Sequence, residues 1–64
     1  MVLNINRQEL TIDADSETIT VRDLLKYLEI NFRVIVEKNG MIADKGDEIG
    51  EGDDIQIIRF AGGG

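Results

Sequence analysis

The sequence predicts a small α+β fold in which one helix packs on a mixed sheet of four to five strands. Apolar and polar residues alternate with period two near both ends of the chain, as in half-buried strands. The period becomes helical only once, over residues 21–28. A chain of 64 residues is long enough for one domain, which we expect over residues 1–60.

The first two strands are predicted as a hairpin. Residues 2–6 alternate apolar and polar side chains, residues 6–8 have the character of a turn, and residues 9–12 alternate again. This phase places Leu10 and Ile12 toward the core.

The helix is expected at residues 21–28, because four apolar residues there have the spacing i, i+3, i+4, i+7: Val21, Leu24, Leu25 and Leu28. Thr20 is the expected N-cap. Asp23 lies three residues later and completes a capping box, with a shorter acid than the usual Glu or Gln.

The second half begins with another predicted hairpin. Residues 34–38 are rich in β-branched side chains, and residues 41–42 form a short returning strand. Between them, Asn39 and Gly40 both tolerate the positive φ that a type I′ turn requires.

The remaining segment is predicted as a long surface loop followed by a final strand. Residues 43–54 contain three glycines and many acids, which favour a loop with Ile49 turned inward. Residues 55–60 form the last strand. We expect it beside the first strand and parallel to it, because the helical crossover brings the two hairpins together.

The composition excludes most familiar active sites. Seven basic and 13 acidic residues give a net charge of −6, and Cys, His, Trp and Pro are absent. A zinc site of Cys and His, a disulfide framework, a thiol nucleophile and a Ser–His pair are therefore excluded, and we expect no bound metal or cofactor. The acidity argues against nucleic acid as a partner and favours basic or apolar protein surfaces. No apolar run is long enough for a membrane span, and the expected location is the cytoplasm.

The three glycines that follow the final strand are the most informative feature. Gly62, Gly63 and Gly64 have no side chain to bury, so we expect residues 61–64 to form a flexible tail. Such a tail is either a frayed end or a thin segment that threads a channel of a partner. In the second case it presents the α-carboxylate of Gly64. A carboxylate is a poor acyl donor, so a partner enzyme would have to activate it with ATP.

The final strand has apolar residues on both of its faces, so one apolar pair remains outside the core. If Ile55 and Ile57 face the core, alternation exposes Ile58 and Phe60 on the other face. Val2 and Ile35 have the same phase and are expected to join them. These four residues are either scattered surface hydrophobics or a docking patch beside the tail.

Four segments together resemble the sulfur carrier proteins of thiamine biosynthesis, which are related to the small subunit of molybdopterin synthase. They are the helix with its cap at 20–28, Val-Ile-Val-Glu-Lys-Asn-Gly at 34–40, Gly-Asp-Asp at 52–54, and the end Ile-Gln-Ile-Ile-Arg-Phe-Ala-Gly-Gly-Gly at 55–64. The resemblance covers nearly the whole chain and implies the ubiquitin-like β-grasp fold.

The resemblance also implies a function as a carrier and not as an enzyme. A ubiquitin-activating-like adenylyltransferase would adenylate the Gly64 carboxylate with ATP. Sulfur from a cysteine desulfurase or a related source would then give a thiocarboxylate, from which thiazole synthase takes the sulfur. The alternatives are a carrier for molybdopterin or tRNA thiolation, a ubiquitin-like protein modifier, and an interaction module whose tail is inert.

Overall fold

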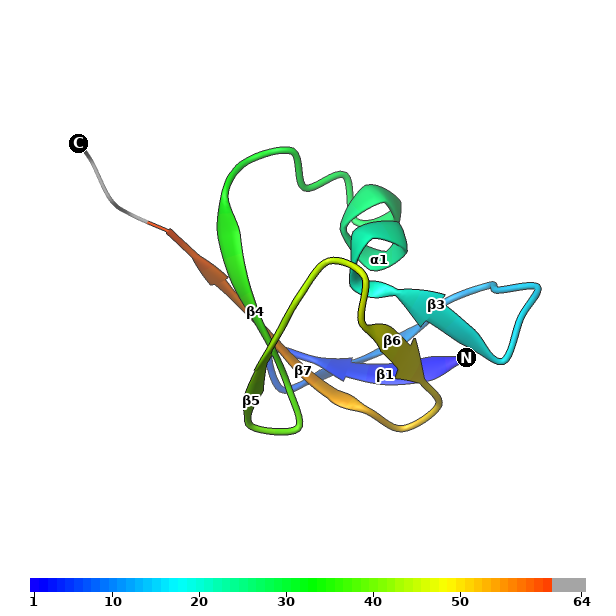
Figure 1. Ribbon diagram of the computed structural model, residues 1–64. Helices are drawn as coiled ribbons and strands as arrows, with labels where there is room; N and C mark the ends of the chain where they lie inside the picture. The colour runs from blue at the N-terminus through cyan, green and yellow to red at the C-terminus, as the bar shows by residue number, and fades with distance from the viewer. Residues whose placement is uncertain (61–64) are drawn as a thin grey trace.

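The computed structural model describes residues 1–60, in which it contains seven strands and one helix (Figure 1). In chain order they are β1 (Val2–Ile5), β2 (Gln8–Thr11), β3 (Thr18–Thr20), α1 (Val21–Tyr27), β4 (Val34–Lys38), β5 (Met41–Ala43), β6 (Glu48–Gly50) and β7 (Asp54–Arg59). The tail predicted at residues 61–64 lies outside the described residues.

The main sheet has five strands in the order β2-β1-β7-β4-β5. β7 runs parallel to β1 and antiparallel to β4, and the two outer pairs are antiparallel hairpins. Figure 1 shows α1 across one side of this sheet, with β3 and β6 beside it. The predicted mixed sheet, and the parallel placement of the last strand next to the first, are both confirmed.

Helix α1 begins where the capping box places it. The Asp23 amide donates to Thr20 Oγ1 at 3.1 Å, and the Thr20 amide donates to Asp23 Oδ2 at 3.2 Å. The shorter Asp therefore closes the capping box in place of the usual Glu or Gln. The helix ends at Tyr27, with Leu28 as its C-cap.

The helix closes with a Schellman motif. The Glu29 amide donates to the Lys26 carbonyl at 3.0 Å, and the Ile30 amide donates to the Leu25 carbonyl at 2.9 Å. Glu29 has a φ of 58°, the left-handed conformation that this motif requires and that glycine usually supplies. The chain thus reverses after two helical turns without a glycine.

The core lies between the helix, the sheet and the segment before β7. Its buried residues are Leu3, Ile12, Val21, Leu24, Leu25, Val36, Ile49 and Ile55. Leu10 is half-buried against this cluster, opposite Leu3 on β1. The inward positions predicted for Ile12 and Ile49 are confirmed. In residues 1–60, no helix is both long and apolar enough to cross a membrane.

The prediction of a single loop over residues 43–54 is wrong. This segment contains β6, which pairs with β3 in a separate two-stranded sheet. Ile19 lies opposite Ile49 in that pair. Thr18 Oγ1 also donates to Glu48 Oε2 at 3.0 Å. Strands of three residues show too little alternation to reveal a period. The pairing depends on the burial of Ile49, which brings together segments far apart in the sequence.

Candidate functional site

The strand that leads to the C-terminal residues is held in the middle of the main sheet. β7 lies between β1 and β4, and both pair with it. The amide of Phe60, the last described residue, donates to the Arg33 carbonyl at 3.2 Å. The ladder on the β4 side thus continues past Arg59, where β7 ends, and holds Phe60 at the edge of β4.

On the β1 side, a side chain continues the ladder after β1 has ended at Ile5. The Ile57 amide donates to Asn6 Oδ1 at 2.7 Å, and Asn6 Nδ2 donates to the Ile57 carbonyl at 3.3 Å. The Asn6 amide therefore replaces a peptide group, and Asn6 itself has a φ of 50°, which Asn tolerates better than most residues. From the sequence, Asn6 is expected only to end the first strand and to begin the turn. The sequence signal for its hydrogen bonds to Ile57 is an Asn at the end of a strand.

Asp53 fixes the turn that precedes β7. Its carboxylate accepts from the Gly50 amide at 2.8 Å and from Asn39 Nδ2 at 3.0 Å. Partial burial alone would raise the pKa of Asp53, but these two hydrogen bonds and the Lys38 charge outweigh it and hold the pKa below its ordinary value. Asn39 has a φ of 51° and Gly40 a φ of 88°, which confirms the predicted turn.

Two cation–π pairs flank the end of β7. The Arg59 guanidinium lies 4.6 Å from the centroid of the Phe32 ring, and the Arg33 guanidinium lies 5.9 Å from that of Phe60. Arg59 has the phase of the core-facing Ile57, whereas Phe60 has the opposite phase. The segment after α1 therefore contacts this end of the strand on both faces of the sheet.

The sheet face turned away from the helix carries an apolar surface next to Phe60. Ile58 and Phe60 are 43% and 49% exposed, and Ile35 lies directly opposite Ile58 on β4. The predicted exposure of Ile58 and Phe60 is confirmed, and Ile35 lies beside Ile58 as expected. The docking role of these residues stays a prediction.

Val2 is not part of this surface, and its predicted place in the patch is wrong. The Val2 carbonyl accepts from the Gly52 amide, before β7 begins. Ile58 lies near the other end of β7, about 20 Å away at the usual rise per residue. Alternation gives the face of a residue but not its position along the strand, which depends on the parallel register of β1 and β7.

Ile42 belongs to this surface, although sequence reasoning did not include it. It is 75% exposed and lies opposite Glu37, which shares a face with Ile35 two residues earlier on β4. The alternation of the second hairpin contained this signal. We define the outer apolar surface as Ile35, Ile42, Ile58 and Phe60.

Comparison with known protein families relates this chain to one of them. The model of the ThiS family matches residues 2–64. The chain belongs to the ThiS family. It is also similar to the crystal structure of a thiamine biosynthesis protein (ThiS) from Geobacter metallireducens, with 30% identity over 100% of both chains and a TM-score of 0.82. No curated protein matches the sequence. The ThiS likeness confirms the predicted β-grasp fold.

The ThiS match includes Gly62, Gly63 and Gly64, the residues for which the sequence predicts a chemical role. These three lie outside the described residues, so their predicted threading into a partner stays a prediction. Among residues 1–60, no group of three or more Asp and Glu side chains is arranged to hold a metal ion. In residues 1–60, the candidate site therefore consists of the outer apolar surface and the end of β7, which hydrogen bonds hold on both edges.

Proposed function

We propose that this chain is a sulfur carrier of thiamine biosynthesis, with the Gly64 carboxylate as the group that is adenylated and converted to a thiocarboxylate. The observation that carries the proposal is the ThiS match through Gly64, directly after a strand held on both edges. The glycines belong to the matched region, which supports a role for them.

The chemistry needs two displacements. A Gly64 carboxylate oxygen attacks the α-phosphorus of ATP, and pyrophosphate leaves to give an acyl-adenylate. A hydrosulfide equivalent then attacks the carbonyl carbon, and AMP leaves with the electron pair of the C–O bond. The product is a thiocarboxylate, whose sulfur is nucleophilic and transferable. ATP is bound and used by a ubiquitin-activating-like adenylyltransferase. A cysteine desulfurase or a related protein supplies the sulfur as a persulfide, from which a thiol releases hydrosulfide and is itself oxidised to a disulfide.

The folded part of the chain serves recognition in this proposal, and the chain is not itself an enzyme. The outer apolar surface adjoins Phe60, from which residues 61–64 continue, so a partner covering it has the C-terminus within reach. Exposed apolar groups of this kind gain from burial against a partner. Thiazole synthase is the expected recipient of the sulfur.

Intact mass spectrometry tests the proposal. The chain is incubated with ATP, sulfide and the adenylating enzyme of the same cell, and exchange of one oxygen for one sulfur is expected. A variant lacking Gly64 is the matched control and should keep the fold but gain no sulfur. Sulfur incorporation into that variant would show that another group is the site. Transfer from the charged chain to thiazole synthase, and not to a molybdopterin or tRNA-thiolating enzyme, identifies the pathway.

A further inference from the structure

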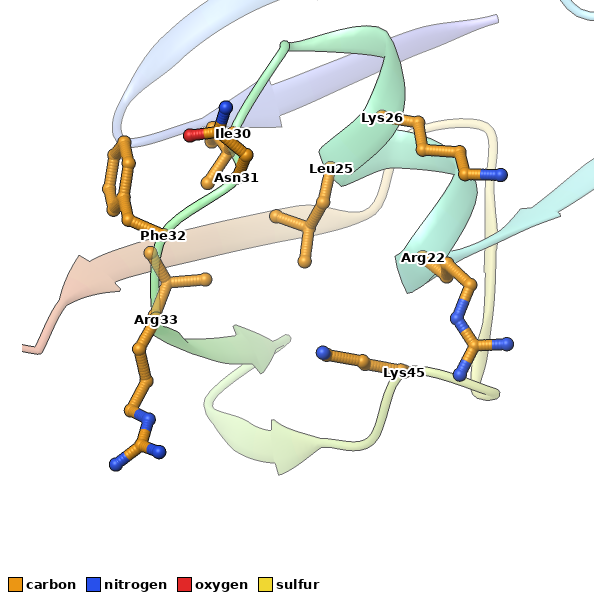
Figure 2. A pocket seen from close by; sticks show the side chains of 9 residues that line it. Arg22, Leu25, Lys26, Ile30, Asn31, Phe32, Arg33 and Lys45 are labelled. Carbon is orange, nitrogen blue, oxygen red and sulfur yellow. The ribbon is translucent and has the colours of Figure 1, made fainter.

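A hollow on the helix side of the molecule gathers basic side chains. It lies between α1, the segment from α1 to β4 and the loop from β5 to β6, and has a volume of about 350 Å³ (Figure 2). Four basic residues line it: Arg22, Lys26, Arg33 and Lys45. We call these four residues and the apolar side chains between them the basic hollow.

The charge of the basic hollow is opposite to that of the whole chain. It contains four of the seven Lys and Arg residues, whereas the 13 acidic residues of the chain contribute none to its lining. A net charge of −6 therefore coexists with a positive concave surface. Such a local field attracts negative groups of a partner.

The frame of the basic hollow is fixed by backbone contacts. Arg22 and Lys26 are one helical turn apart on α1, so they lie on the same face. The Arg22 amide donates to the Lys45 carbonyl at 3.0 Å and ties the β5–β6 loop to the start of the helix. Figure 2 shows Lys45 extending beneath Leu25.

The cations are distributed around the rim and do not converge on one point. In Figure 2, the Arg33 guanidinium is directed away from the hollow on the side opposite Lys26. A single phosphate or carboxylate cannot contact them all. An extended segment with several carboxylates can approach Arg22, Lys26 and Lys45 in succession, since each exposed cation acts on its own neighbour.

The floor between these cations is apolar. Leu25 is buried, Ile30 and Val34 are half-buried, and Phe32 is 47% exposed at the margin. A purely charged ligand gains nothing from this floor, whereas an apolar side chain between two acids does. The occupant that fits both features is an acidic protein segment with an apolar residue within it.

The basic hollow also borders the end of β7. Phe32 lies under the Arg59 guanidinium, and the Arg33 carbonyl accepts from the Phe60 amide. A protein that takes the C-terminus therefore lies beside the hollow.

We infer that the basic hollow binds an acidic segment of the adenylating enzyme that receives the C-terminus. The inference rests on the proposed function and adds a second contact on the helix side, separate from the outer apolar surface. The segment places its carboxylates near Arg22, Lys26 and Lys45 and an apolar side chain over Leu25.

Carbodiimide cross-linking tests which lysines face carboxylates of the enzyme. The reagent joins an ammonium group to a carboxylate at contact distance, and peptide mass spectrometry locates the bond. An Arg7→Lys chain provides an exposed control lysine in the β1–β2 turn, which does not line the hollow. Cross-links to the enzyme are expected at Lys26 and Lys45 and not at position 7. A complex that cross-links only at position 7, or at none of these lysines, would overturn the inference.

Charge reversal tests the same contact by affinity. Arg22→Glu and Lys45→Glu are each expected to weaken binding to the adenylating enzyme about tenfold at low ionic strength. Arg7→Glu changes the charge equally and should stay within about twofold. The difference should shrink between about 0.01 M and about 0.15 M salt, where the Debye length falls from about 30 Å to about 8 Å. Thermal unfolding of each variant checks that the fold is kept.

Adenylation of the wild-type chain separates the possible failures. If the enzyme does not adenylate wild type, the proposed function fails and this inference fails with it. If wild type is adenylated and both reversals bind like Arg7→Glu, only the inference about the hollow is wrong. If inorganic phosphate displaces the enzyme from wild type but not from the reversed variants, the hollow is a small-anion site, which also contradicts it.

Discussion

Ile35 and Ile58 lie directly opposite each other on β4 and β7, on the face of the sheet that helix α1 does not cover. Both have the phase opposite to the core residues of their strands, and Ile58 is 43% exposed. This pair forms the centre of the outer apolar surface, with Phe60 and Ile42 around it.

Phe60→Asp is expected to weaken binding to the adenylating enzyme at least about tenfold, because it puts a charge into an apolar contact. The free energy of unfolding should change by less than about 1 kcal/mol, since the ring is half exposed in the free chain. Titration calorimetry and urea denaturation measure the two effects.

The matched control for this variant is Thr11→Asp, which adds the same charge at an exposed position of β2, opposite Val2. It should bind like wild type. A large drop in stability of Phe60→Asp, or equal losses of binding in both variants, would contradict the role of the outer apolar surface.

Asn6→Ala is expected to destabilise the fold by about 1–3 kcal/mol, because it removes both hydrogen bonds to Ile57 and leaves β7 without a partner there. Hydrogen exchange at the Ile57 amide should accelerate together with the loss of stability. Denaturation and amide exchange monitored by NMR provide the measurements.

Asn6→Gly separates the hydrogen bonds from the backbone conformation. Glycine adopts the φ of 50° at Asn6 without strain, so this variant should be more stable than Asn6→Ala but less stable than wild type. If Asn6→Gly equals wild type in stability and in Ile57 exchange, the side-chain amide does not hold the strand.

Glu29→Gly is expected to stabilise the chain by about 0.5–1 kcal/mol, because glycine takes the left-handed conformation after α1 at lower cost. Glu29→Ala is the control, since it removes the same carboxylate but keeps the Cβ. Thermal melts of the three proteins distinguish these effects. An equal gain in Glu29→Ala would assign the stabilisation to the lost charge.

Asp53 should make stability depend on pH in the acid range. Its pKa is lower in the folded chain than the ordinary value of 3.8, so the folded state binds the proton less tightly than the unfolded state. The contribution is therefore present above pH 3.8 and is lost as the pH falls through the lower, folded pKa.

Urea denaturation at a series of pH values checks this for wild type and Asp53→Asn. The variant should be less stable at neutral pH, because it disturbs the contacts with Gly50 and Asn39, and its stability should fall less steeply with acid. If the free energy of unfolding falls equally with acid in the two proteins, Asp53 is not the source of this pH dependence.

The elements that sequence reasoning predicted depend on local signals. The apolar stripe from Val21 and the capping box of Thr20 act within one or two turns and placed the helix start correctly. Asn39 and Gly40 set their turn through their own backbone preferences. Alternation along residues 55–60 separated Ile55 and Ile57 from Ile58 and Phe60, and the structure placed Ile55 in the core and Ile58 at the surface.

The features that sequence reasoning missed depend on contacts between distant segments. β3 and β6 are too short to show a period, and they form because Ile19 and Ile49 pack opposite each other. Val2 has the phase of Ile58, but the register of β1 on β7 places it far from that residue. The Asn6 amide acquires its role only when Ile57 arrives beside it.

The sequence by itself therefore determined the kind of fold, the start of the helix and its cap, the alternation of faces along the longer strands and the glycines within the ThiS match. Only the tertiary structure decided which side chains share a surface. The register of the strands places Ile42 on the outer apolar surface and Val2 outside it. Packing of three segments brings four basic residues of an acidic chain to the lining of one hollow. Periodicity acts along the chain, whereas strand register and the packing of loops against the helix set distances across it.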